Sequence, residues 1–435
     1  MPSYVSGHKN KTGFCHLSTN CNINSNVRTQ NNLLKNISSE FLYWFSGFTD
    51  AEGNFLISID RQYVRFRFKI SLHMDDVEVL NTIKSNLNVG TVTLESSRNS
   101  CSYVIQNYEE IKNVICPIFN AFPLHTSKRL DFENFSQAVF IKDNQKLSNT
   151  DISKIVSLKN TMNSKREIFT YNTTKSQIII NPNWFIGFIE GEGTFGIKTG
   201  SALYFQVSQK NTSQESLNAI TTFLTGLSSN VLQKSKILPL NVISTTNVRT
   251  DVVSLVVNSV DSLYYYLLPL LDTSNMYSRK AIDFHLWRVA LLLKIKGYYY
   301  LPEGKTLFLD ISDILNKRYS TNTTKNMSEI MHNIFKRSQT IFEKDPLFDV
   351  KSNIPHSDNV RKFSIQNRSD NPKIVYIYTN NGIVEGSPFV SYSSAHKALG
   401  LNPSSNTCNR YIDTGRLYKN NFIFSSKPID SASRD

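Results

Sequence analysis

The stretch FSGFTDAEGNF (residues 45–55) returns 140 positions later as FIGFIEGEGTF (residues 185–195). Each copy is an apolar run with small residues four positions apart, and each carries a glutamate that is followed by glycine. Because glycine is the residue most often found just past a helix end, each copy predicts a helix that stops at its glutamate. Why a chain would twice end an apolar helix on an acid is the question that this repeat raises.

The small residues predict how the two helices pack. Gly47 and Ala51 share one face of the first predicted helix, and Gly187 and Gly191 share one face of the second, because residues four apart are neighbours on a helix surface. A stripe of small residues lets two backbones approach closely. We therefore expect helix against helix about a pseudo-twofold axis, with the flanking phenylalanines buried in separate cores.

This packing places Glu52 and Glu192 side by side at the C-terminal ends of the helices. A carboxylate there faces the negative end of the helix dipole, at a cost of about 0.3–1 kcal/mol, and Asp50 and Glu190 add further negative charge. A divalent cation would neutralise the cluster, and oxygen ligands without Cys or His favour Mg²⁺ over zinc. The alternative is a core helix that was duplicated along with everything else and ends in Glu without a function.

The repeat continues beyond these helices. FKISLH (68–73) aligns with FQVSQK (205–210) and LNTI (80–83) with LNAI (217–220), both at an offset of 137, and Pro117, Lys128 and Asp131 align with Pro269, Lys280 and Asp283 at an offset of 152. Four ordered agreements indicate a duplicated unit of helix, two strands, helix, strands and helix.

The strand after each helix has one apolar and one polar face. Residues 64–70 alternate between apolar and basic side chains, and residues 203–210 alternate between apolar and polar ones, which is typical of half-buried strands. Matching outward faces in both copies favour a nucleic-acid-binding sheet over plain solvation. The side chains expected to contact DNA from these strands are Arg61, Arg65, Arg67, Lys69, Tyr204, Gln206, Ser208 and Lys210.

Composition supports a polyanionic partner. The 435 residues carry a formal net charge of +13 with a pI near 9.3, which favours nucleic acid or an anionic surface as partner. Five scattered cysteines form no CxxC pair and predict neither a disulfide framework nor a zinc site. No apolar run is long enough to cross a bilayer, and the first 20 residues have no signal or transit-peptide pattern.

The motifs WFSGFTDAEGNF and WFIGFIEGEGTF resemble the two motifs of a single-chain LAGLIDADG homing endonuclease of the organellar intron-encoded type, over residues 38 to 335. The resemblance implies an α+β fold of two pseudo-symmetric αββαββα units, whose antiparallel sheets form a DNA-binding saddle. It also implies that Glu52 and Glu192 are the metal-binding catalytic acids, with the carbonyl groups of Ala51 and Gly191 as further ligands to Mg²⁺ or Mn²⁺.

Three more pocket residues follow from the resemblance. Lys128 and Lys280 match the basic residue of each active-site pocket, although a phosphate-contacting or surface role stays open for both. Gln209 matches the pocket glutamine of the family, whereas its counterpart in the first unit is Leu72. This apolar departure predicts that the two sites work at unequal rates.

The chain divides into six predicted segments: a leader (1–37), the first unit (38–164), a linker (165–182), the second unit (183–335), a second linker (336–373) and a C-terminal module (374–430). In the module, a helix capped by Ser393 or Ser394 ends before Gly400, a second helix opens at Pro403, and a strand follows. This pattern resembles a nuclease-associated modular DNA-binding domain with helix-turn-helix character. The residues then expected to face DNA are Ser404, Ser405, Asn406, Asn409 and Arg410, with Lys397 and Arg416 nearby. A folded tail of no specific role is the alternative.

The resulting hypothesis is a monomeric, metal-dependent endonuclease that cuts both strands of a long DNA site and promotes intron mobility from within a mitochondrion. An Asn-, Ile-, Lys-, Tyr- and Phe-rich composition fits an AT-rich coding genome. Two rivals stay open: an RNA-binding maturase that assists splicing of its host intron, and a DNA-binding protein that has lost activity.

Overall fold

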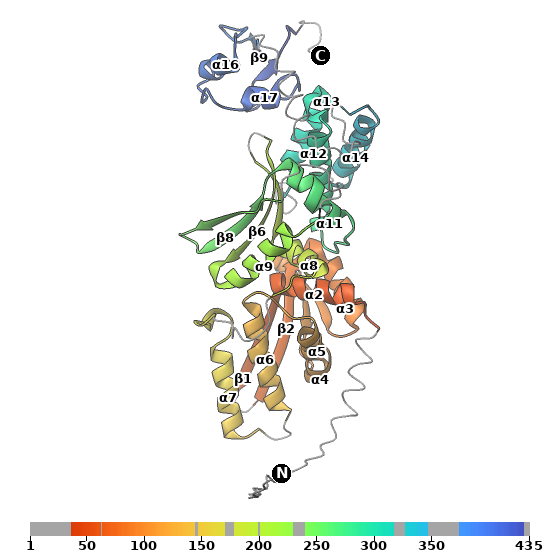
Figure 1. Ribbon diagram of the computed structural model, residues 1–435, viewed down its shortest axis with the longest axis vertical. Helices are drawn as coiled ribbons and strands as arrows, with labels where there is room; N and C mark the ends of the chain where they lie inside the picture. Colours follow the sequence, from red (N-terminus) through yellow and green to blue (C-terminus); the bar gives the residue numbers. More distant parts are fainter. Residues whose placement is uncertain are drawn as a thin grey trace, which may run out of the picture.

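The computed structural model describes residues 36–61, 63–143, 147–169, 178–198, 201–228, 240–316, 327–346 and 374–429. Figure 1 shows three bodies along the long axis: unit 1 in red to yellow, unit 2 in green to teal, and the C-terminal module in blue. Nearly all of the predicted leader lies outside the described residues. No helix among these residues is long and apolar enough to span a membrane.

Unit 1 follows the predicted order. Its elements are α2 (Ser39–Glu52), β1 (Gly53–Asp60), β2 (Tyr63–His73), α3 (Val77–Leu87), β3 (Thr91–Glu95), β4 (Ser100–Ile105), the continuous helical segments α4 (Tyr108–Glu110), η3 (Ile111–Ile115) and α5 (Cys116–Ala121), then α6 (Lys128–Lys142) and α7 (Asn149–Asn160). The four strands form an antiparallel sheet in the order β1-β2-β4-β3.

Unit 2 repeats this plan. Its elements are α8 (Pro182–Glu192), β5 (Gly193–Ile197), β6 (Leu203–Lys210), α9 (Gln214–Thr225), β7 (Ile243–Asn247), β8 (Val252–Val257), α10 (Val260–Ser262), η6 (Leu263–Leu267), α11 (Leu268–Asp272), α12 (Lys280–Ile295), α13 (Pro302–Ile314) and α14 (Met327–Phe342). The sheet order β5-β6-β8-β7 is antiparallel and matches that of unit 1. The predicted α+β fold with two αββαββα units is confirmed.

One domain boundary was placed too early. The predicted end of unit 2 at residue 335 falls inside α14, which continues to Phe342. Ile334 and Ile341 on this helix are buried in the same core as the rest of unit 2, and Arg337 pairs with Asp310 of α13 at 2.6 Å. The segment 336–342 therefore belongs to unit 2, because its apolar face is covered by that unit.

The alternation in the strands is as predicted. In β2, Val64, Phe66, Phe68 and Ile70 are buried, and the residues between them are exposed or half-buried. In β6 the same holds for residues 203–207. The apolar faces of both sheets pack against the helices of their own unit, so the opposite faces carry the polar side chains outward.

The C-terminal module has its own small core. It contains a sheet in the order β10-β9-β11, formed by β9 (Tyr376–Thr379), β10 (Gly382–Ile383) and β11 (Ile423–Ser425), and the helices α16 (Tyr392–Ala398) and α17 (Thr407–Tyr411).

Two predicted details of the module's helices were wrong. The cap of α16 is Ser391, which forms a capping box with Ser394, and α17 begins at Thr407 rather than near Pro403. Buried His396 accounts for the short second helix, because its ring accepts the backbone N–H of Cys408 at 3.1 Å and so fixes the start of α17 from within the core.

Candidate active site at the helix pair

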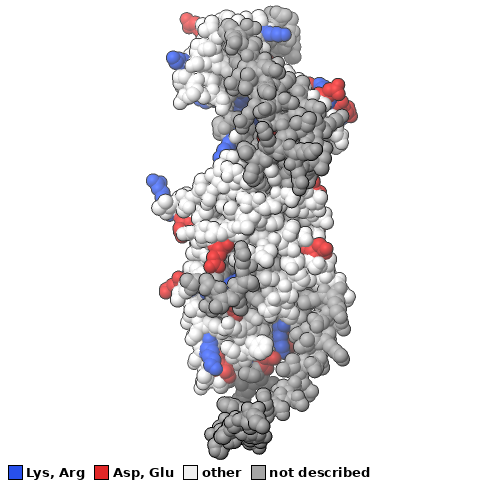
Figure 2. Space-filling model, viewed as in Figure 1, with Lys and Arg blue, Asp and Glu red and all other residues white. Residues whose placement is uncertain are grey.

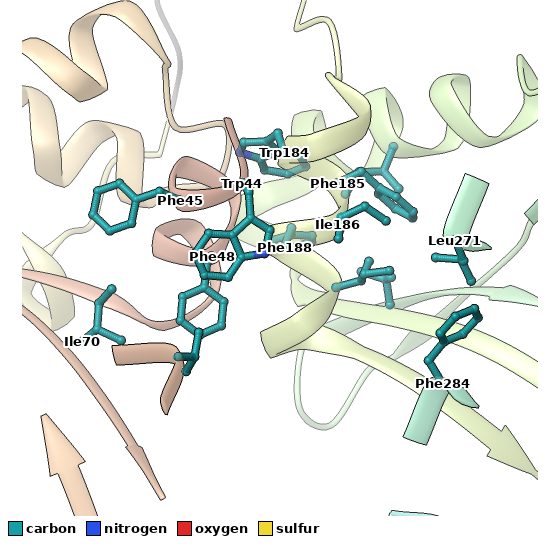
Figure 3. Close-up of a cluster of buried hydrophobic side chains, with 14 of the residues drawn as sticks. Trp44, Phe45, Phe48, Ile70, Trp184, Phe185, Ile186, Phe188, Leu271 and Phe284 are labelled. Carbon is teal, nitrogen blue, oxygen red and sulfur yellow. The ribbon is translucent and has the colours of Figure 1, made fainter. Parts of the chain in front are cut away.

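Helices α2 and α8 pack backbone to backbone through their small residues. A Cβ atom added at Gly47 would lie 1.9 Å from the carbonyl oxygen of Trp184, and one added at Gly187 would lie 2.0 Å from that of Trp44. Figure 3 shows Phe45 and Phe185 pointing away from each other, each into its own unit. The close pseudo-twofold contact predicted from the glycine spacing is therefore present.

The helix contact brings the two acids together. Glu52 Oε1 lies 2.9 Å from the position of a Cβ on Gly191, the residue directly before Glu192. Burial raises the pKa of both carboxyl groups, and their proximity adds to the rise at Glu192. Two half-buried acids whose ionisation is made costly by burial, and at Glu192 also by the neighbouring carboxylate, are an arrangement that a bound cation would stabilise.

Asp50, which was predicted to add negative charge near the acids, attracts Lys128 and is itself held by hydrogen bonds. It is buried and accepts the backbone N–H of His125 at 2.7 Å, the hydroxyl of Thr126 at 2.6 Å, and the indole N–H of Trp184 from the opposite helix at 3.0 Å. These bonds fix the loop that leads directly into Lys128, the first residue of α6. Asp50 is thus a support for the pocket lysine.

Glu190 repeats this arrangement in unit 2. It accepts the backbone N–H groups of Tyr277 at 3.0 Å and Ser278 at 2.6 Å, and the indole N–H of Trp44 at 2.5 Å. The loop that it fixes leads into Lys280, the first residue of α12. The two tryptophans are exchanged between the helices, so each unit contributes to the support of the other unit's pocket.

The two lysines reach the helix ends. Lys128 Nζ donates to the carbonyl oxygen of Ala51 at 2.7 Å and to that of Thr49 at 3.2 Å, and Lys280 Nζ donates to that of Gly193 at 2.8 Å. Burial lowers the pKa of Lys128, an effect opposed by the nearby acids. The pocket role predicted for both lysines fits this placement better than a surface role does.

The pocket glutamine is present in one half only. Gln209 hydrogen-bonds to Glu192 and so opposes the rise in the pKa of that carboxyl group, whereas Leu72 lies half-buried beside Glu52. A cavity of about 360 Å³ lies on this side, lined by Phe48, Glu52, Ser71, Leu72, His73, Asp76, Glu190, Gly191, Ser278 and Lys280. The sequence analysis missed Asp76, although its alignment with Ser213 at the offset of 137 was a signal that could have found it.

The donor set at the helix ends suits a hard cation. No group of three or more His, Cys, Asp or Glu side chains among the described residues could hold a metal by itself. The available oxygen ligands are the carboxylates of Glu52 and Glu192 and the predicted carbonyl ligands of Ala51 and Gly191. The carbonyl oxygen of Ala51 already accepts a hydrogen bond from Lys128 Nζ. Such a partial oxygen shell fits a hard divalent cation that keeps open positions for water and phosphate.

The predicted DNA-contacting side chains of β2 and β6 lie on the outward sheet faces, and Arg61 lies in the turn between β1 and β2. Arg61, Arg65 and Lys210 are exposed, while Arg67, Lys69, Tyr204, Gln206 and Ser208 are half-buried. On the side of the molecule shown in Figure 2, the described basic and acidic side chains are scattered and form no continuous patch. DNA contact by the sheet residues stays a prediction.

The module's arginines face unit 2. Arg410 donates to Ser312 Oγ at 3.4 Å, and Arg416 pairs with Asp310 at 3.3 Å and with Asp313, all on α13. Ser404, Asn406, Asn409 and Lys397 are exposed, and Ser405 is half-buried with its hydroxyl 2.8 Å from that of Thr407. The arginines therefore contact α13 rather than pointing into solvent, and DNA contact by the module stays a prediction.

Comparison with known proteins agrees with the two motifs. The model of the LAGLIDADG endonuclease family matches residues 45–139 and 185–291, so the match includes part of each unit and both acids. Both halves of the chain therefore resemble the LAGLIDADG endonuclease family. The uncharacterized mitochondrial protein RF1 of Saccharomyces cerevisiae is 27% identical over 420 residues, which cover 92% of this chain and 85% of the relative.

Other known proteins match shorter parts of the chain. The probable intron-encoded endonuclease Cox1-I1b of Schizosaccharomyces pombe is 31% identical over 195 residues, 42% of this chain and about half (49%) of the relative. The homing endonuclease I-GzeII, solved in complex with its DNA target, superposes with a TM-score of 0.53 at 25% identity over 64% of this chain and 98% of that chain. I-SmaMI, solved on uncleaved DNA with calcium ions, gives a TM-score of 0.53 at 19% identity, covering 62% and 97%.

Proposed function

We propose that this protein is a site-specific endonuclease that hydrolyses one phosphodiester bond in each strand of a long DNA target, and so promotes mobility of its host intron. The observation that carries the proposal is the close approach of the two helix ends between two outward-facing sheets: Glu52 Oε1 lies 2.9 Å from the position of a Cβ on Gly191, the residue before Glu192. A minor groove is about 6 Å wide. Two neighbouring acids could therefore each reach one of two scissile phosphates on opposite sides of that groove.

Glu52 and Glu192 would hold Mg²⁺ with the Ala51 and Gly191 carbonyl groups, and the metal supplies an activated water and stabilisation of the leaving oxygen. Lys128 and Lys280 are held at the helix ends. The ammonium group of each lysine would therefore lie beside one scissile phosphate and stabilise its charge. Gln209 orients Glu192, whereas Leu72 offers Glu52 no amide, so the two strands are cut at unequal rates. The DNA complex of I-GzeII supports action on DNA, and the mitochondrial relative RF1 supports a mitochondrial location. Action as a monomer in the matrix is part of the same proposal.

The test compares DNA cleavage by wild type and by Glu52→Gln/Glu192→Gln. The substrate is joined-exon DNA, in which the two exon sequences that flank the host intron are continuous. We expect the variant to bind this DNA while its Mg²⁺-dependent cleavage falls by about a thousandfold or more, since losing the metal removes several kcal/mol of transition-state stabilisation. The matched control is Glu78→Gln/Glu215→Gln, an exposed pair repeated at the offset of 137, which should cut normally.

Two outcomes would contradict the proposal. Cleavage that survives in the acid variant would exclude the paired acids as the metal site. A wild type that never cuts this DNA but accelerates splicing of the host intron would replace the nuclease with a maturase.

A further inference from the structure

Each unit contains a helix-start residue that does not cap its own helix. Asp76 stands at the N-cap of α3 and Ser213 at the N-cap of α9, and neither side chain makes a cap hydrogen bond there. Asp and Ser are preferred at this position because their oxygen usually accepts an N–H of the first helical turn. Both residues are buried, with 7% and 1% of their surface exposed.

Their oxygens accept from the other unit instead. Asp76 Oδ1 accepts the backbone N–H of Arg279 at 3.1 Å, and Ser213 Oγ accepts that of Ser127 at 3.3 Å. Arg279 is the N-cap of α12 and Ser127 is the N-cap of α6. Each therefore bonds the residue directly before a pocket lysine.

We propose that Asp76 and Ser213 are positioning residues, each of which fixes the pocket lysine of the opposite unit: Asp76 fixes Lys280 and Ser213 fixes Lys128. Together with Glu190 and Asp50, which hold the preceding loop residues from within the same unit, they give each lysine two supports from different units. The Ser213 hydroxyl thus accepts the backbone N–H before Lys128, as the Asp76 carboxylate accepts the backbone N–H before Lys280. The Asp76 side also gains an ion pair between Asp75 and the Arg279 side chain.

The consequence is a crossed dependence between the halves. Asp76 lines the same cavity as Glu52 and Lys280, so its removal should disturb that pocket and leave the Lys128 pocket intact. The kinetic part of this inference rests on the proposed nuclease function, whereas the hydrogen bonds themselves do not.

The first test is amide hydrogen exchange on the full chain, which needs no DNA. Asp76→Ala should speed exchange in the peptide containing Arg279 by about tenfold, the value of one lost hydrogen bond, and leave the peptide containing Ser127 unchanged. Ser213→Ala should do the reverse. Asp76→Asn, which keeps the acceptor oxygen, should restore protection.

The second test follows each DNA strand separately with end labels in single-turnover cleavage. Lys280→Met and Lys128→Met identify the strand that each pocket serves. Asp76→Ala should slow cleavage of the strand that the Lys280 pocket serves by about tenfold, and Ser213→Ala should slow cleavage of the strand that the Lys128 pocket serves. Asp76→Asn should restore the wild-type rate. DNA affinity measured in Ca²⁺ should be unchanged in all three variants.

Exchange that rises in both peptides alike, or in neither, would overturn the inference, as would equal slowing of both strands. A wild type that cuts neither strand would refute the proposed function and leave the exchange experiment to decide this inference alone.

Discussion

Unit 1 carries Leu72, Asp76 and Ala51 where unit 2 carries Gln209, Ser213 and Gly191. By contrast, the residues that support these positions are matched: a tryptophan and a buried acid from each helix, and a lysine at the start of the following long helix. The two halves thus share their framework and differ beside the acids. A duplicated protein needs an equivalent scaffold on both sides of the axis, whereas two strands of an asymmetric DNA site can be served by unequal pockets.

Variants at the contact between α2 and α8 should have the largest effect on cleavage. Gly191→Ala would place its Cβ 2.4 Å from that of Ala51 and 2.9 Å from Glu52 Oε1, so Glu52 must move. A displacement of about 1 Å costs roughly a hundredfold in rate, and we expect that loss in cleavage of joined-exon DNA.

The matched variant Ala51→Gly removes the facing methyl group and should cost about 1 kcal/mol of unfolding free energy through helix propensity, with cleavage close to wild type. Equal cleavage by Gly191→Ala and wild type would show that the helices are not in the described contact.

The pocket difference can be tested by making the halves alike. Leu72→Gln gives Glu52 the amide that Gln209 gives Glu192, and we expect the slower strand to be cut up to about tenfold faster, the value of one well-placed hydrogen bond. Gln209→Leu should slow the other strand by a similar factor. End-labelled duplexes followed strand by strand measure both, and acceleration of both strands by Leu72→Gln would contradict independent pockets.

A half-buried lysine pair gives the smallest expected effect. Lys142 and Lys294 occupy matching positions on α6 and α12, at the offset of 152. Lys294 Nζ donates to Ser201 Oγ at 2.8 Å and lies 3.3 Å from the ring centre of Tyr299, and burial lowers its pKa to about 7. Lys142 Nζ donates to the carbonyl oxygen of Val64 at 2.7 Å. Burial lowers the pKa of Lys142 as well, but Lys142 is less deeply buried than Lys294.

Because unfolded Lys294 has the ordinary pKa of 10.5, the unfolded chain binds more protons than the folded chain between pH 7 and 10.5. The free energy of unfolding should therefore rise with pH above 7, by about 1–2 kcal/mol up to pH 9. Thermal unfolding at both pH values should show this rise in wild type and in Lys142→Met, and a weaker one in Lys294→Met. A rise of equal size in all three proteins would assign it to other groups.

The comparison between halves also explains what the sequence could predict. The helix pair, the sheets and Glu52 and Glu192 were predictable, because each element occurs twice in the sequence in the same order. Asp50 and Glu190 were assigned to the charge cluster instead of to their supporting role, because their partners His125 and Tyr277 lie 75 and 87 residues away and only the fold brings them together. Asp76 was missed for the same reason, since its partner is in the other unit.

A crystal structure with joined-exon DNA and Mn²⁺ tests most directly whether both acids hold divalent cations beside one duplex. Anomalous scattering should place metal within about 2.1–2.3 Å of carboxylate oxygens of both Glu52 and Glu192, next to one phosphate of each strand. Metal bound away from these two side chains, or at one of them with the other turned into its own unit, would contradict the account.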